Sequence, residues 1–306
     1  MRTVNGEPAN PGTVVTRSAR AVRVYASFVR FSHSVFALPF ALAGMLLALR
    51  QQGAQPFLPA GLFWIVVAMV GARSAAMGFN RLVDARMDAL NPRTAMRELP
   101  RGAMTMREAA AFVAVASAIF VFAAWRLNPL CLALSPVALA IVFWYSLAKR
   151  YTTWTQLFLG VSMAVAPVGG WLAAGGRGGW EPWLLAAAIG AWVGGFDVLY
   201  ACQDLEFDRA HGLRSIPVRF GVARSLAISR AMHAIAVVCL LALALVAPLG
   251  PIYLAGVGVV AAMLVYEQSL VRADDLSQVK RAFDLNGYVG ILYLLVLTAA
   301  LYGPWR

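Results

Sequence analysis

Two segments of the chain place oxygen-bearing side chains at intervals of four residues. Residues at this spacing lie on one face of a helix, so each segment would present a column of oxygen atoms. Stacked carboxylates repel one another and require a neutralising partner. Carboxylate oxygens bind hard cations, and Mg²⁺ in particular keeps open positions for phosphate oxygens. The alternative is two solvated helix ends with ordinary acidic residues. The first column is Asn80, Asp84 and Asp88, and the second is Tyr200, Asp204 and Asp208.

The composition indicates the surroundings of these columns. Hydrophobic residues make up 61% of the 306 residues and charged residues only 13%. This apolar share is too large for one buried core, so lipid must be the solvent. The net charge of +12 is compatible with nucleic-acid binding, but the basic residues fall between apolar stretches. That distribution favours membrane topology and contact with anionic lipid.

Nine apolar stretches are long enough to cross about 30 Å of hydrocarbon. We therefore expect an all-α polytopic membrane protein with nine transmembrane helices, formed as one domain over residues 1–306. Residues 1–24 form a polar tail in which we recognise no signal peptide. The stretches cover residues 32–50, 58–79, 108–125, 128–148, 154–174, 182–201, 223–248, 251–269 and 283–303.

The 26 lysines and arginines are distributed unevenly about these stretches. Most lie in the N-terminal segment or in the loops after the second, fourth, sixth and eighth stretches. The positive-inside rule predicts that these loops face the cytoplasm, including the two motif loops, 80–107 and 202–222. Both motif loops continue with an arginine beside a hydroxyl residue and then Pro and Gly. This repetition indicates an internal duplication of residues 58–174 and 182–303, with a site at their interface.

These segments resemble the UbiA superfamily of intramembrane aromatic prenyltransferases. Residues 80–88 match its N-x-x-x-D-x-x-x-D motif, and residues 200–208 match its Y-x-x-x-D-x-x-x-D motif. Residues 145–152 are similar to the Y-x-x-x-K-R-x-T segment of 4-hydroxybenzoate polyprenyltransferases. The family often has Asp after the Asn, where this chain has Arg81, so one possible ligand is missing. This form resembles a bacterial branch with members linked to menaquinone formation by the futalosine route.

The resemblance implies nine helices around a central cavity in the bacterial inner membrane. It also implies Mg²⁺-dependent transfer of a polyprenyl group from its diphosphate to a ring carbon of an aromatic acid, in ubiquinone or menaquinone biosynthesis. The acid would be 4-hydroxybenzoate or a dihydroxynaphthoate. Two Mg²⁺ ions held by the two columns would offset the charge of the diphosphate. The expected partners are therefore polyprenyl diphosphate, the aromatic acid and membrane lipids, with no nucleic acid and no obligate protein partner.

Basic residues near the columns are candidates for diphosphate binding. Arg73 lies inside an apolar stretch, where a charge is costly and usually faces a polar cavity, and it shares a helix face with the first column. Snorkelling or a structural ion pair is the alternative. Lys149 and Arg150 end the fourth stretch, and Arg93 and Arg214 lie in the two motif loops. Membrane anchoring is the alternative for the first pair, and plain positive-inside charge for the second.

The aromatic acid requires contacts of its own. Arg30 opens the first stretch and can pair with a carboxylate, unless it is one more positive-inside charge, and His33 can line the same site. Asp197 lies on the face of the second column and can accept the phenol proton, or it can be a partner of an arginine or a metal ligand. Tyr200 can hydrogen-bond the diphosphate or a metal ligand. Tyr145 can shield the allylic cation, or simply pack.

Two other classes of function are compatible with a polytopic membrane protein. A cation-coupled transporter also uses intramembrane carboxylates and repeats, but it usually places its acidic residues near mid-span. Here the acidic residues stand at the ends of the stretches, beside arginine-rich loops. A non-catalytic scaffold leaves the duplicated acidic residues unexplained. Nucleotide-binding fingerprints are also missing, so the sequence predicts prenyl transfer without a nucleotide cofactor.

Overall fold

The computed structural model describes residue 28 and residues 37–53 and 59–303. In this part of the chain, all regular structure is helical apart from one isolated bridge between Arg272 and Asp275. Eight helices are long and apolar enough to cross a membrane, and α3 (Leu38–Gln51) is a shorter apolar helix. The predicted all-α fold with nine helices is therefore confirmed, although residues 32–36 of the first stretch lie outside the described residues. The eight long helices are α4 (Pro59–Leu90), α5 (Met106–Leu127), α6 (Pro129–Tyr151), α7 (Thr155–Ala173), α8 (Glu181–Ala201), α10 (Ile216–Val246), α11 (Gly250–Ser269) and α12 (Val279–Tyr302).

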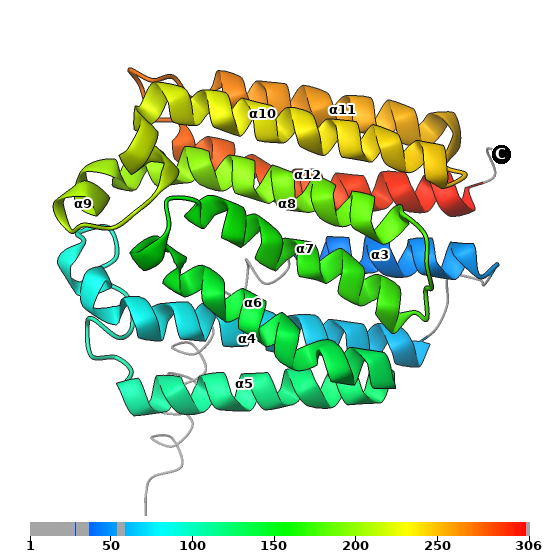
Figure 1. Ribbon diagram of the computed structural model, residues 1–306, viewed down its shortest axis with the longest axis horizontal. Helices are drawn as coiled ribbons and strands as arrows, with labels where there is room; N and C mark the ends of the chain where they lie inside the picture. Colours follow the sequence, from blue (N-terminus) through cyan, green and yellow to red (C-terminus); the bar gives the residue numbers. More distant parts are fainter. Residues whose placement is uncertain (1–27, 29–36, 54–58, 304–306) are drawn as a thin grey trace, which may run out of the picture.

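Helix α3 lies in the middle of the bundle, beside α7 and α12 (Figure 1). Its contact with α7 is very close, because a side chain added at Gly44 would collide with the backbone oxygen of Pro167, and one added at Gly170 with that of Ala41. Small residues let helix backbones approach in this way within lipid, where packing rather than water exclusion holds helices together. The two glycines therefore fix α3 against α7.

The ends of α4, α6 and α8 gather at one end of the bundle, on the left of Figure 1, together with the loop 91–105. We call this the motif end. Helix α4 has 32 residues, a length of about 48 Å that exceeds the roughly 30 Å of hydrocarbon. The part of α4 beyond the membrane contains the first motif. The expected motif loop 80–107 is thus helical up to Leu90, and the connecting loop begins only at Asn91. Each half compared in the sequence contains four long helices, and the first of each four, α4 or α8, leads into an acidic motif.

The second motif has a different local structure. After α8 the chain forms a 3₁₀ turn (Cys202–Asp204) and then the short helix α9 (Leu205–Ala210). Helix α10 starts after Ser215, whose side chain accepts a hydrogen bond from the Val218 amide, and it bends at Gly221, which has a φ of 76°. The second column therefore does not stand on one continuous α-helix, whereas the first does.

A cavity of about 450 Å³ opens among α3, α4, α5, α6 and α7, with α8 at its edge. Its wall is almost entirely apolar. Arg73 from α4 and Tyr145 from α6 are two of its few polar lining residues. This cavity is only partly enclosed, and it lies chiefly among helices of the first half, whereas the resemblance predicts a central cavity.

Candidate active site

The first column stands on the last turns of α4. Asp84 and Asp88 are buried, with 3% and 6% of their surface exposed, and Asn80 is half-buried. Asn80 Nδ2 donates a hydrogen bond to Asp84 Oδ2 over 3.3 Å. The i, i+4 spacing thus brings the side chains into contact along one face, as expected.

Each buried carboxylate of this column is paired with basic side chains. Asp84 accepts from Lys149 Nζ at 3.1 Å and from Arg150 Nη2 at 3.0 Å, so the end of α6 lies beside the column. Asp88 accepts from Arg97 Nη1, which lies 2.8 Å from both carboxylate oxygens. The neutralising partner that stacked acids require is therefore supplied by the chain itself.

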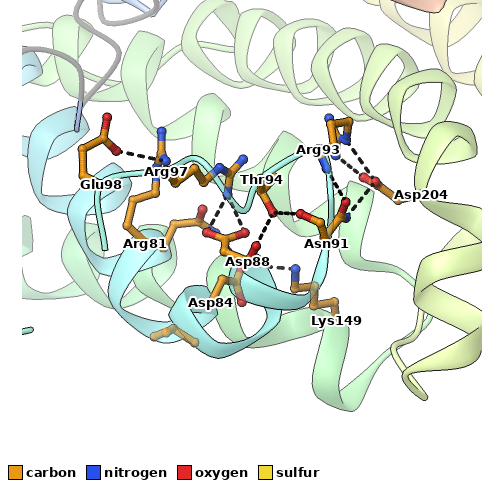
Figure 2. A network of polar contacts seen from close by, with 12 residues as sticks. Arg81, Asp84, Asp88, Asn91, Arg93, Thr94, Arg97, Glu98, Lys149 and Asp204 are labelled. Carbon is orange, nitrogen blue, oxygen red and sulfur yellow. Dashed lines mark hydrogen bonds and ion pairs between the residues drawn. The ribbon is translucent and has the colours of Figure 1, made fainter. Parts of the chain in front are cut away.

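The second column is joined to the first through the loop 91–105. Arg93 forms an ion pair with Asp204 through Nε and Nη2, and its Nη1 donates to the hydroxyl of Tyr200 at 2.5 Å. Its guanidinium also lies over the Tyr200 ring, 5.1 Å from the centroid. Asn91, at the start of the same loop, points its amide at Asp204 (Figure 2). Two motifs more than 100 residues apart in the sequence thus form one polar network.

Two carboxylates of this region stand apart from that pairing. Among the described residues, neither Asp197 nor Asp208 has a basic nitrogen within 4 Å. Asp208 is 9% exposed and Asp197 is half-buried on α8. The described residues also contain no group of three His, Cys, Asp or Glu side chains placed to hold a metal ion together. The carboxylates of Asp84, Asp88 and Asp204 are instead directed at arginine and lysine.

The structure places the remaining predicted basic residues in two different settings. Arg73 lines the apolar cavity, and its Nε is buried without a hydrogen-bond partner among the described residues. Tyr145, on the same cavity wall, lies within electrostatic range of Arg73, Asp84 and Asp197, which links the cavity to the polar network. Arg214 instead donates to the backbone oxygen of Tyr151 at 2.7 Å, at the end of α6, and forms no ion pair among the described residues.

Aromatic rings stand close to both motifs. Phe79, beside the first column, stacks on Phe143 with ring centroids 4.5 Å apart. Phe283 of α12 contacts both Phe196 and Tyr200 of α8, at 5.5 and 4.9 Å. Aromatic side chains therefore lie beside both columns.

Two predicted residues cannot be located, because Arg30 and His33 lie outside the described residues. Conversely, the sequence analysis did not assign Arg97 or Asn91 to the site, although both contact its carboxylates. The signal for them was available: both belong to the polar loop directly after the first column, and an acidic column needs counter-charges within reach.

Known proteins resemble this chain in both sequence and fold. A 4-hydroxybenzoate octaprenyltransferase of Vibrio campbellii is 30% identical over 241 residues, covering 78% of this chain and 84% of the relative. The apo structure of a UbiA homologue from Aeropyrum pernix K1 is 38% identical, with a TM-score of 0.78 over 89% of this chain and 98% of that chain. A UbiA homologue from Archaeoglobus fulgidus, solved with GPP and Mg²⁺, shares the fold (TM-score 0.69, 18% identity, 91% of this chain and 99% of that chain).

The sequence pattern of the UbiA prenyltransferase family matches residues 37–297, which include both acidic columns and every long helix up to the last turns of α12. The expected enzyme class and the expected integral membrane nature of the protein are therefore confirmed. The chain belongs to the UbiA prenyltransferase family and is an integral membrane prenyltransferase.

Proposed function

We propose that this protein transfers a polyprenyl group from polyprenyl diphosphate to a ring carbon of an aromatic acid, either 4-hydroxybenzoate or a dihydroxynaphthoate. The observation that carries the proposal is the set of ion pairs that joins the two acidic columns to four basic side chains, beside an apolar cavity that Arg73 lines. The Vibrio relative supports an aromatic acceptor through its name, and the Archaeoglobus homologue supports the donor through its bound GPP.

The donor set suits Mg²⁺. Hard cations prefer oxygen ligands, and the columns offer carboxylate and amide oxygens on two segments that the loop 91–105 joins. Asp208, buried without a basic partner among the described residues, supports the same reading. We infer that Asn80, Asp84 and Asp88 hold one ion and that Asp204 and Asp208 hold a second. When bound, the ions supply Lewis-acid stabilisation of the diphosphate charge.

Basic side chains complete diphosphate binding. Lys149, Arg150, Arg93 and Arg73 border the columns or the cavity, and each can donate charge-assisted hydrogen bonds to phosphate oxygens. Arg214 extends this basic surface from the end of α6. These donors also stabilise the negative charge that grows on the diphosphate as the allylic C–O bond breaks with its electron pair.

The cavity receives the prenyl chain. Its apolar wall binds hydrocarbon and excludes water, which would otherwise capture the allylic cation. Tyr145 lines the cavity and Tyr200 contacts Arg93 at the second column, and both can stabilise that cation through their π-systems. The ring carbon of the acceptor then bonds to the allylic carbon, and the proton on that ring carbon is released.

Acceptor activation falls to Asp197. Among the described residues this carboxylate has no basic partner, so it is available to accept the phenol proton and raise the nucleophilicity of the ring. Arg30 and His33 are assigned to the carboxylate end of the acceptor from their place in the sequence. We further infer that the motif end faces the cytoplasm of a bacterial inner membrane, because most basic residues gather there.

Product analysis tests the proposal. Membranes that contain the protein are supplied with Mg²⁺, polyprenyl diphosphates of several lengths, and either 4-hydroxybenzoate or a dihydroxynaphthoate. Mass spectrometry should detect the prenylated acid with one of the two acceptors and nothing in membranes without the protein. Absence of a prenylated product with both acids would refute the acceptor class.

A further inference from the structure

A buried ion pair joins α4 to the loop that follows it. Arg81 Nη1 lies 3.4 Å from Glu98 Oε2, and only 4% and 6% of the two side chains are exposed. Arg81 stands directly after Asn80 and takes no part in the first column (Figure 2). Because burial of two charges is costly, an apolar pair would serve simple packing at least as well. Simple packing therefore does not explain why two charges are buried here.

Glu98 lies between two residues that attach the loop 91–105 to the rest of the protein. The residue before it is Arg97, which binds Asp88. The residue after it is Leu99, which packs against the apolar cluster around the buried Met104. The backbone oxygen of Glu98 also accepts from the Met104 amide at 3.3 Å. Movement of Glu98 would therefore displace the arginine on one side and the apolar anchor on the other.

The two attachment points on α4 set the direction of the loop. Arg81 and Asp88 are seven residues apart, which is about 10.5 Å along a helix axis. Since adjacent residues of the loop bind these two points, the loop must follow one side of α4. The same course carries Arg93 across to Asp204 on the far side of the site.

We propose that Arg81 and Glu98 are a positioning pair, which sets the loop on α4 so that Arg97 and Arg93 reach Asp88 and Asp204. The pair acts through these arginines and does not touch the reacting atoms. The inference rests on the proposed function, in which Arg93 of this loop binds diphosphate and Arg97 holds Asp88 of the first column. Loss of the pair should therefore weaken binding of the prenyl diphosphate and leave binding of the aromatic acid unchanged.

Charge exchange tests the pair. The variants are Arg81→Glu, Glu98→Arg, the exchanged double variant, and the apolar double variant Arg81→Met/Glu98→Met. KM is measured separately for each substrate, and the melting temperature is recorded in detergent. Lys280 and Asp284, an exposed pair on α12, are exchanged as a matched control, and this variant should retain both KM values.

Each single variant should raise KM for the prenyl diphosphate about tenfold or more, because displacement of the loop removes at least one charge-assisted hydrogen bond to the diphosphate. KM for the acid should change less than about twofold. The exchanged variant should recover most of that loss. The apolar variant should have the melting temperature of the unaltered enzyme but the raised KM of the single variants.

Three results would overturn the proposal. The first is a normal KM in the apolar variant, which would limit the pair to folding. The second is an equal loss for both substrates, and the third is no recovery on exchange. If the single variants do not accumulate, the two double variants still decide. Absence of transfer by the unaltered enzyme would instead refute the proposed function, so the two failures are distinguishable.

Discussion

Replacement of Arg93 is the most informative perturbation of this site, because one side chain joins the two acidic columns. It contacts Asp204 through two nitrogens and Tyr200 through a third, and it lies over the tyrosine ring. Arg93→Ala removes all of these contacts together with a positive charge beside the diphosphate position. Arg93→Lys keeps the charge but cannot form the forked contact.

The magnitude follows from the number and exposure of the contacts. A charge-assisted hydrogen bond contributes about 1.5–3 kcal/mol when buried and less when solvated. Arg93 is 36% exposed and Asp204 21%, so we take about 1–2 kcal/mol for each of two partners. Arg93→Ala should then lower kcat/KM for the prenyl diphosphate by about 30- to 1000-fold. Arg93→Lys should lose about 5- to 30-fold.

The assay is steady-state turnover of the purified enzyme with each substrate varied in turn. Arg101 belongs to the same loop but is exposed, so Arg101→Ala is the matched control and should behave as the unaltered enzyme. KM for the aromatic acid should change less than about twofold in all three variants. If Arg93→Ala falls no further than Arg101→Ala, the joining of the two columns has no part in catalysis.

The remaining predictions concern the metal and the acceptor. Chelation by EDTA should abolish turnover and Mg²⁺ should restore it, and full activity in metal-free membranes would contradict the metal assignment. Asp84→Ala and Asp208→Ala should each lower the rate by orders of magnitude while the protein still inserts, as membrane fractionation can verify. Arg30→Ala should raise KM for the acid about 10- to 150-fold and leave the diphosphate nearly unaffected; a loss confined to the diphosphate would move Arg30 to the diphosphate site. Asp197→Asn should lower kcat more than it raises KM, and an unchanged kcat across pH would exclude it as the base.

The features that depend on local sequence were predicted well. Hydropathy predicts the membrane helices, because a run of about 20 apolar residues is long enough to cross the hydrocarbon layer and is rarely stable in water. The contact between Asn80 and Asp84 follows from helix periodicity alone. The same periodicity fails after Tyr200, where the 3₁₀ turn at 202–204 interrupts the helix. A pattern of spacing cannot reveal such an interruption, since the spacing is the same in both motifs.

The features that depend on tertiary structure could not be read from the sequence. The pairing of Arg93 with Asp204 joins residues 111 positions apart, and the preference of Arg214 for a backbone oxygen at the end of α6 depends on how two loops meet. The same is true of a buried polar cluster away from the site, in which Asn286 forms hydrogen bonds with Trp192 and Glu267. It forms only when α8, α11 and α12 pack together. Residue type alone predicts which side chains are costly to bury, whereas their partners depend on the tertiary structure.

The central claim is that the two acidic columns hold a metal-bound prenyl diphosphate. Calorimetric titration of the purified protein with an unreactive thiolo analogue of a prenyl diphosphate tests it without turnover. The account predicts tight binding with Mg²⁺, and binding at least about 100-fold weaker after EDTA treatment or in Asp84→Ala. Equal affinity with and without the metal, in the unaltered protein and in the variant, would contradict it.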